Sequence, residues 1–528
     1  MKRLSLIFLM VLSACLAKGQ FLQITEGPLF PAPKNGIAKI LQMKNGSTFF
    51  LHIDFASGIN AQVYEPVYRG KTETQFEPAK FKLRSGKVEG IFETNGDVVL
   101  MFSDTGNNET ALYRLVVDGK SATLKNEEKI ASVKKIALKN DNTESSADNL
   151  PELAVSKDAT DGNYAVAFFN NNLSDTSKRI EVILYGNDNR EINRAFYSAK
   201  KEKYKYIKYI DMAVIGPDKV AALLYGYNRQ ASGEKTGEMI LATLEKGASS
   251  LRISELNYSN DLVPENGIVR YEKIFNQLLV LTTARVKSDT NKLRNYLGYI
   301  NLASRELNIN TVIGPGEKVK LKYTELNGKK AVYKAVPQNI LLNEDRSYTI
   351  IFEEMETETK NGAVSHSIIR NTSIVNYNPE GEVTDAYFIP LEHHVTGIPV
   401  IPFYLSQQNI LGQQLFNNAQ YSLSKYITDG HNSFLLLNDK QVNAKGGSLN
   451  KIEPFKDMTG TDAFFCRLSG KEISPELQYV FGKSISDEER KLALFSVSDY
   501  DRANNLLVLL KQDKENGRSG VKLVWLQP

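Results

Sequence analysis

Short runs of consecutive apolar residues recur along the whole chain, each after a cluster of turn-forming residues. The eight runs are TFFLHIDF from Thr48, DVVLMFS from Asp97, YAVAFF from Tyr164, VAALLYGY from Val220, LLVLTTA from Leu278, YTIIFEE from Tyr348, FLLLND from Phe434 and LLVLLKQ from Leu506. Gly, Asn, Asp and Pro gather before them, and these residues accept the backbone angles of tight turns. The pattern predicts β-strands, because windows with the 3.6-residue period of a helix do not stand out.

Weaker strand-like segments flank each run. KVEGIFET from Lys87 precedes the run at Asp97, for example, and ALYRLVVDG from Ala111 follows it. The repeating unit is therefore strand, turn, very apolar strand, variable loop, strand, turn and last strand. The apolar runs are spaced by about 50 to about 86 residues with a mean near 65, so about eight units fill the chain.

The consecutive apolar positions predict how these units pack. They bury both faces of a strand, whereas a sheet with one wet face alternates. Radial stacking of four-stranded sheets buries both faces of every unit and leaves no long open edge. We predict an all-β fold, a single β-propeller of about eight four-stranded blades. A seven-bladed ring is the next choice, and two tandem β-sandwich domains are the alternative.

The first nineteen residues differ from the rest of the chain. Two basic residues precede an apolar run of about nine residues, and small residues follow, which is the order of a secretory signal peptide. The run is too short to span a bilayer as a helix. We predict a signal peptide over 1–19, cleaved between Gly19 and Gln20. The propeller then covers 20–528, and its N- and C-terminal strands are expected to close the ring.

A second interpretation of the leader changes the expected location. The tetrapeptide Leu-Ser-Ala-Cys that ends at Cys15 resembles the lipobox of bacterial lipoproteins. An acylated Cys15 would anchor the protein to a membrane. We therefore expect an exported protein, periplasmic or extracellular, with an outer-membrane lipoprotein as the alternative.

Charge and cysteine content exclude several classes of site. Loss of the leader lowers the formal net charge from +4 to about +1, so bulk charge gives no reason to expect nucleic-acid binding. Cys466 is the one cysteine besides Cys15. The mature chain therefore has no intramolecular disulfide and no metal site built on paired thiolates.

The histidines do not form an evident catalytic or metal site. His393 and His394 follow Glu392, but neighbouring residues on a strand point to opposite faces. A structural role is favoured for this pair, and His431 is interpreted as a polar turn residue. No G-x-S-x-G nucleophile motif occurs.

Oxygen-rich turns occur near Asp104, Asp188 and Asp499. They lack the spacing of a calcium-binding loop, and Asx turns account for them without an ion. We predict no catalytic, cofactor-binding or metal-ligating residues.

The segment AKKEKYKYIKYIDM from Ala199 alternates lysine with tyrosine. Such alternation suits a path for single-stranded nucleic acid. It also describes an outer edge strand whose lysines guard against aggregation. The edge-strand interpretation is favoured, because an exported protein rarely meets nucleic acid.

The signatures of familiar propeller families are mostly missing. The single tryptophan, Trp525, rules out repeated WD dipeptides and aspartate boxes. ATDGNYAVAFF and IGPDKVAALLYG resemble the repeat of TolB-like propellers over about ten residues each. The chain more broadly resembles uncharacterised exported bacterial β-propeller proteins, and this resemblance implies a fold but no catalytic residues.

These observations lead to an exported, non-enzymatic binding or scaffold protein, expected to be a monomer. We expect its rim loops, the longest of which are 353–366, 399–430 and 438–462, to bind a protein or glycan in the cell envelope. The alternative is a carbohydrate-active or other hydrolase with carboxylates at the central channel. A lipidated Cys15 would favour a subunit of an envelope complex.

Overall fold

A computed structural model describes most of the chain from residue 23 onwards. The predicted signal peptide lies outside the described residues, as do Cys15, Gly19 and Gln20. The described residues are 23–528 without 67–69, 107–108, 135–151, 170–178, 198–202, 205, 228–236, 260, 329–330, 361–362, 397–402, 404–405, 407–409, 416–423, 446–451, 471–472, 487–488 and 516.

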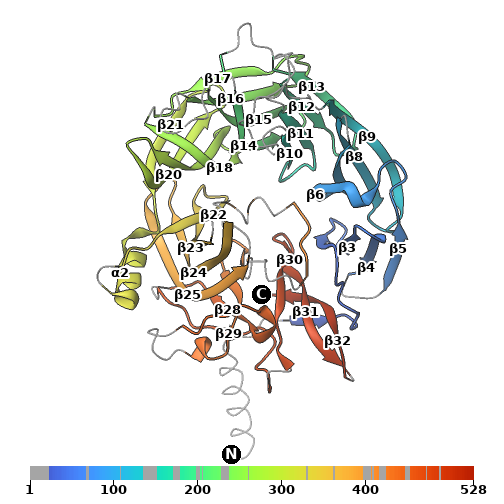
Figure 1. Ribbon diagram of the computed structural model, residues 1–528, viewed down its shortest axis with the longest axis vertical. Coiled ribbons are helices and arrows are strands. Elements are labelled where there is room, and N and C mark those ends of the chain that lie inside the picture. Colours follow the sequence, from blue (N-terminus) through green and yellow to red (C-terminus); the bar gives the residue numbers. More distant parts are fainter. Residues whose placement is uncertain are drawn as a thin grey trace, which may run out of the picture.

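Eight four-stranded antiparallel sheets stand around one axis as the blades of a β-propeller (Figure 1). The predicted single ring of eight blades is therefore confirmed, and the alternatives of seven blades and of two tandem β-sandwiches are excluded. The innermost strands are β2 (Ile37–Gln42), β6 (Gly86–Thr94), β10 (Glu152–Lys157), β14 (Tyr206–Ile215), β18 (Leu262–Glu272), β22 (Ala335–Leu342), β26 (Ser424–Thr428) and β30 (Ala493–Asp501).

The second strand of each blade is one of the eight apolar runs. These strands are β3 (Thr48–Asp54), β7 (Asp97–Thr105), β11 (Tyr164–Phe169), β15 (Lys219–Tyr227), β19 (Gln277–Val286), β23 (Tyr348–Lys360), β27 (Ser433–Asp439) and β31 (Leu506–Glu515). All six residues of β11 are buried. Sheet neighbours on both edges and blades on both faces exclude water from this strand, which explains its continuous apolar sequence.

Third and outermost strands complete the blades. The third strands are β4 (Gly58–Tyr64), β8 (Glu109–Asp118), β12 (Ile180–Tyr185), β16 (Gly237–Glu245), β20 (Asp289–Asn301), β24 (Ala363–Tyr377), β28 (Asp462–Arg467) and β32 (Arg518–Gln527). The outermost strands are β5 (Lys71–Phe76), β9 (Leu124–Lys134), β13 (Glu191–Phe196), β17 (Arg252–Leu256), β21 (Leu307–Ile313), β25 (Val383–Thr396), β29 (Gln478–Tyr479) and, from the N-terminal end of the chain, β1 (Gln23–Glu26).

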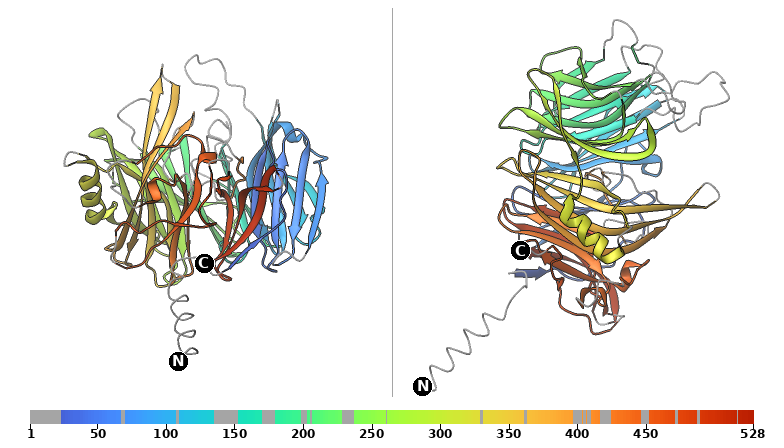
Figure 2. Two further views of the ribbon diagram at one scale, coloured as in Figure 1. Left: turned by 90° about the horizontal axis from the view of Figure 1, so that it is seen from below. Right: turned by 90° about the vertical axis from the view of Figure 1, so that its left-hand side faces the viewer.

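The ring closes where the two ends of the chain meet. Strand β1 pairs antiparallel with β32, and Figure 2 shows it beside the C-terminus. The Trp525 indole on β32 donates a hydrogen bond of 2.9 Å to Thr48 Oγ1 on the first blade. Because distant parts of the chain supply these contacts, closure holds the last blade to the first.

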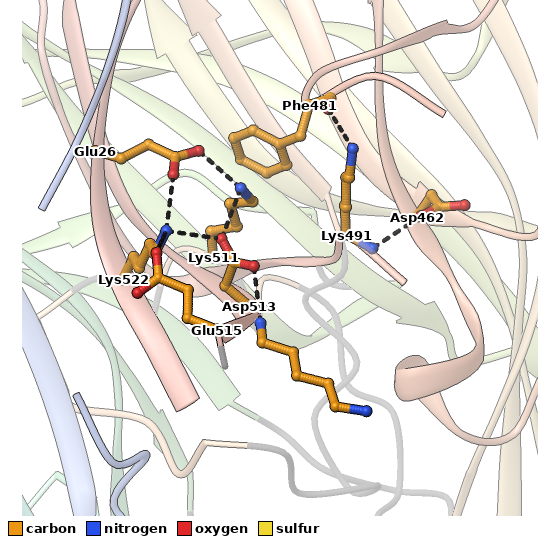
Figure 3. A network of polar contacts seen from close by, with 9 residues as sticks. Glu26, Asp462, Phe481, Lys491, Lys511, Asp513, Glu515 and Lys522 are labelled. Carbon is orange, nitrogen blue, oxygen red and sulfur yellow. Dashed lines mark hydrogen bonds and ion pairs between the residues drawn. The ribbon is translucent and has the colours of Figure 1, made fainter. Parts of the chain in front are cut away.

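A group of ion pairs, the closure network, surrounds this junction (Figure 3). Glu26 on β1 lies 2.7 Å from Lys511 Nζ and 3.2 Å from Lys522 Nζ. Asp513 pairs with both lysines, and Glu515 pairs with Lys522 at 2.5 Å. The Lys511 ammonium also lies over the Phe481 ring of the neighbouring blade, 5.1 Å from its centre.

The described residues of the connection between β25 and β26 lie on the inside of the ring. They bond to the free edges of innermost strands: Phe403 N–H donates to Pro337 O, and Ile410 O accepts from Ile91 N–H. Gln413 and Ala38 exchange two backbone bonds of 2.7 and 2.9 Å. These edges face the axis, since the second strand covers the other edge. The described part of 399–430 therefore does not project from the rim as expected.

Of the other two expected rim loops, the described part of 353–366 projects beyond the neighbouring blades, whereas 438–462 packs against a blade (Figure 2). Most of 353–366 belongs to the long hairpin of β23 and β24. In 438–462, Phe455 is buried and stacks on the His393 ring. Loop length alone did not distinguish a projecting loop from one that covers a blade.

Two further features were not predicted from the pattern. Helix α2 (Gly316–Asn327) buries only Val319 and Tyr323, too few residues for an apolar stripe to stand out. The Lys-Tyr segment enters β14, which is an innermost strand and not the expected outer one. The alternation of lysine and tyrosine indicates a strand at the edge of a sheet, but it does not distinguish the innermost edge from the outermost one. Among the described residues, no helix is long and apolar enough to cross a bilayer.

Candidate functional site: a polar pocket between two blades

A pocket of about 500 Å³ lies between the blade of β6–β9 and the blade of β10–β13. This volume is within the range of small-ligand sites. Strands β8 and β9 form one side, and the end of β12 with the turn into β13 forms the other. The lining residues are Arg114, Asn126, Glu128, Lys129, Ile130, Tyr185, Asp188, Asn189, Arg190 and Glu191.

Arg114 holds one side of the pocket together. It sits on β8 directly opposite Glu128 on β9, and its Nε donates to Glu128 Oε1 at 2.9 Å. Its guanidinium also donates to the Tyr164 hydroxyl and lies 4.6 Å from the centre of the Tyr185 ring. Burial by itself lowers the pKa of Arg114, but Tyr164 and Glu128 raise it overall. Arg114 is therefore a fixed cation at the boundary between the blades.

The β12–β13 turn forms the opposite wall. Gly186 and Arg190 close the turn with a backbone hydrogen bond of 2.9 Å, and Asp188 Oδ1 accepts from Arg190 N–H at 3.0 Å. Asn189 has a φ of +66°, which asparagine tolerates better than most residues. Its Oδ1 accepts from the Tyr164 hydroxyl at 2.9 Å. These bonds fix the turn and leave the Arg190 side chain 87% exposed.

The pocket is polar but balanced in charge. Three lining side chains are cationic, three are acidic and two are amides. Amides and mixed charges offer both donors and acceptors, whereas an anion site presents mainly donors. Burial raises the pKa of Tyr185 to about 12, so its hydroxyl keeps its proton at neutral pH. The chemistry suits a neutral ligand rich in hydroxyl groups.

The pocket was not predicted from the sequence. An arginine within the apolar run ALYRLVVDG was the available signal, because a charge in a buried strand needs partners. Those partners come from β9 and from the next blade, which the local pattern does not reveal.

The structure separates the histidines singled out in the sequence. His393 is buried, and burial lowers its pKa to about 3, so it is neutral. The ring of His394 contacts Glu392 at 2.8 Å. His431 is exposed in a turn held by Asp429. The structural and turn roles expected for these residues agree with these contacts.

The acidic turns also have backbone roles. Asp188 forms the turn described above, and Asp499 Oδ2 accepts from Gln42 N–H of the next blade at 2.8 Å. Asp104 lies on β7, opposite Gly86 and Ala111. Within the described ranges, no three His, Cys, Asp or Glu side chains are grouped as metal ligands would be. Cys466 is buried, which raises the pKa of its thiol to about 12.

Carboxylates near the axis connect neighbouring blades. Asp158 Oδ2 accepts from Gly216 N–H at 2.9 Å, and Asp211 Oδ2 accepts from Val269 N–H at 2.7 Å. Asp499 makes the equivalent bond at the ring closure. Each carboxylate reaches the backbone of the following blade, so these groups hold the blades in register.

No protein-family model and no curated protein matches the chain. Among solved structures, the polysaccharide lyase Uly1 is similar at 9% identity, covering 96% of this chain and 100% of that one, with a TM-score of 0.37. A Dyadobacter fermentans protein of unknown function is also 9% identical, covering 96% and 98%, with a TM-score of 0.35.

A prolyl endopeptidase is 7% identical over 91% of this chain, with a TM-score of 0.39, and the chain spans about half, 55%, of that enzyme. These similarities concern the fold alone. The class of protein is an eight-bladed β-propeller, and the expected resemblance to uncharacterised propeller proteins stands.

Proposed function

We propose that the protein is an exported glycan-binding protein that binds a short, uncharged sugar segment in the pocket between β8–β9 and the β12–β13 turn. The observation that carries the proposal is the balanced set of donors and acceptors in a cavity of about 500 Å³. Each sugar hydroxyl donates one hydrogen bond and accepts up to two, so it needs both kinds of partner. The proposed binding element is therefore a pocket between two blades, and not the long rim loops expected from the sequence.

A binding role is favoured over hydrolysis by the state of the pocket carboxylates. Glu128 is bound by Arg114, and Glu191 is 2.8 Å from Arg194. Asp188 accepts from the backbone of its own turn. A glycosidase needs one carboxylic acid that keeps its proton and a second carboxylate across the scissile bond. The three pocket carboxylates are instead engaged in ion pairs or in a turn, which favours a structural role for them and a binding role for the pocket.

The test is binding to an array of neutral, sulfated and uronic-acid oligosaccharides, followed by titration calorimetry of the best ligand. We expect a neutral oligosaccharide to bind and Arg190→Ala to weaken it about tenfold or more, because a hydrogen bond to a charged group is lost. Arg502→Ala removes an exposed arginine from another turn and is the matched control. Equal affinity in both variants, or binding of acidic glycans alone, contradicts the proposal.

The hydrolase alternative is distinguished in the same samples. Release of new reducing ends from the bound oligosaccharide, abolished by Glu128→Gln, would favour an enzyme.

The export route is a separate proposal. The intact mass of the mature chain separates cleavage before Gln20 from acylation of Cys15.

A further inference from the structure

The turn between β18 and β19 carries two exposed apolar residues. Ile274 and Phe275, which we call the apolar tip, are 67% and 53% exposed. Each of the other seven blades has a turn at the same position, between its first and second strands, and the structure describes all seven. None of those turns has an exposed Val, Leu, Ile, Met, Phe, Tyr or Trp. The blade architecture therefore does not require the apolar tip.

Hydrogen bonds hold the apolar tip in one conformation. The Glu272 carboxylate, which is 4% exposed, accepts from Ile274 N–H at 2.8 Å and from Phe275 N–H at 3.1 Å. The Arg346 guanidinium, from the turn of the next blade, lies 4.0 Å from the centre of the Phe275 ring. A turn fixed in this way loses little conformational freedom when a partner buries its side chains.

The apolar tip lies on the rim at which strand β1 begins. Neighbouring strands of a blade run in opposite directions, so the turns after the first and third strands share one rim. Strand β1 starts with Gln23 opposite Gln527, at the end of the third strand of its blade, and so begins at this rim. Figure 2 shows the C-terminus on this side and the long β23–β24 hairpin on the other. Acylation of Cys15, one of the two export routes, would hold this rim close to a bilayer, since the seven residues between Cys15 and Gln23 reach at most about 30 Å.

The charges around the apolar tip are mixed. Lys273 precedes the tip and is exposed, whereas Glu344 and Asp345 are exposed on the turn that carries Arg346. These surroundings give no strong preference for an anionic or a cationic partner. Aromatic and aliphatic side chains with a basic residue beside them suit the interface of a bilayer, where the apolar groups insert and the charge stays among the headgroups.

We propose that Ile274 and Phe275 insert into a lipid bilayer and that the rim around them faces the membrane. Burial of the two apolar side chains provides the attraction, so a neutral phosphatidylcholine surface is sufficient. The apolar tip and the start of β1 point to the same rim independently of each other. The proposal goes beyond the sugar pocket, from which the blade of β14–β17 separates the apolar tip.

The first test asks whether the apolar tip reaches the acyl chains. The fluorescence of Phe275→Trp is compared in phosphatidylcholine vesicles with brominated and with unbrominated acyl chains, because bromine quenches an indole that it contacts. We expect loss of the added fluorescence in the brominated vesicles. Ile485→Trp is the matched control, since Ile485 is 93% exposed in the connection between β29 and β30 on the opposite rim, and it is expected to stay unquenched. Trp525 is 5% exposed and gives both variants the same background.

The second test measures the share of protein that sediments with neutral vesicles. Ile274→Ser combined with Phe275→Ser, the tip variant, is expected to lower the partition coefficient about tenfold or more, because it removes the apolar surface that the bilayer buries. Ile485→Ser is expected to bind as the unaltered protein does, and thermal unfolding checks that each variant folds.

Several outcomes overturn the proposal. Equal quenching of Phe275→Trp and Ile485→Trp does so, as does an unquenched Phe275→Trp in protein that is bound to vesicles. Binding that requires anionic lipid and disappears at high salt contradicts apolar insertion. A dimer that forms without lipid and that the tip variant dissociates assigns the apolar tip to a second copy of the chain.

The sugar proposal fails separately. The tip variant is expected to keep the affinity for a neutral oligosaccharide, and Arg190→Ala is expected to keep the quenching of Phe275→Trp.

Discussion

The lysines of the closure network and Lys39 on β2 lie at similar depth in the protein, but burial affects their charges with opposite results. The side chains of Lys511 and Lys522 are 8% and 10% exposed, and Lys39 is 8% exposed. Burial tends to lower the pKa of Lys522, but Glu515, Asp513 and Glu26 raise it overall. Near the axis, burial prevails over the attraction of Asp499 and lowers the pKa of Lys39 to about 8.

The difference lies in the number of carboxylates and in what they already bind. The closure network has three acids for two lysines (Figure 3). Near the axis, the Asp499 carboxylate, whose charge acts on Lys39, also holds two backbone N–H groups. We infer that the first group stabilises the closed ring, whereas the burial of the Lys39 charge costs stability.

The largest expected effect on stability comes from Glu353, a buried carboxyl group whose pKa is shifted by burial alone. It is 2% exposed, and burial alone raises its pKa to about 8. Between pH 4.5 and 8 the folded chain holds this proton and the unfolded chain does not. The free energy of unfolding therefore falls as pH rises through this window, by up to about 5 kcal/mol.

Glu353→Gln is expected to remove most of that fall, measured by urea unfolding at several pH values. Glu356→Gln, at an exposed position on the same strand, is the control and should leave the pH dependence unchanged. A wild-type slope in Glu353→Gln contradicts the role of burial.

Lys39 gives the next effect, with the opposite slope. Between pH 8 and 10.5 the unfolded chain holds the lysine proton and the folded chain does not, so the free energy of unfolding rises with pH by about 3 kcal/mol. Lys39→Met is expected to be more stable than the unaltered protein by about this amount at pH 7, with the difference vanishing near pH 10.5. A destabilised Lys39→Met at pH 7 contradicts the cost of burying this lysine.

The fold could largely be predicted from the sequence because every blade repeats the same pattern of burial. Every second strand is buried on both faces, and runs such as YAVAFF record this directly. The turns before them carry residues that tolerate unusual backbone angles, such as Asn95 and Gly96. The mean repeat length then favoured eight blades over seven, and the structure has eight.

The candidate sites were not accessible in the same way. Arg114, Tyr164 and Asn189 meet only because two blades pack together, and their separations in sequence are unrelated to the repeat. Gln42 and Asp499, which bond across the ring closure, are still more distant, at 457 positions apart in the sequence. Local pattern identifies what a strand buries, whereas these sites depend on which strands become neighbours around the axis.

Removing acids from the closure network is expected to give a smaller effect than either buried charge above. Glu26→Gln with Asp513→Asn leaves Glu515 as the one acid of the network and takes both acids from Lys511. We expect a loss of about 2 kcal/mol, below the usual cost of breaking a buried pair because Glu26 is 32% exposed.

The same double variant has a pH signature. Burial by itself raises the pKa of Glu26 and of Asp513, but the lysines lower both pKa values overall. The stabilisation that these two acids provide is therefore present at neutral pH and is lost as the solution is acidified below about pH 4. The double variant and the unaltered protein should therefore converge in stability at low pH.

Glu515→Gln is expected to have the smallest effect. The Glu515 side chain is 50% exposed, and Lys522 keeps Glu26 and Asp513 as partners. An exposed ion pair contributes less than about 1 kcal/mol. Glu515 is the acid closest to Lys522, but it is also the most exposed of the three. Urea unfolding of this variant and of the double variant therefore shows whether burial or contact distance determines how much an acid stabilises the fold. If Glu515→Gln costs as much as the double variant, short contact distance outweighs burial, and the contrast between the closure network and Lys39 loses its physical basis.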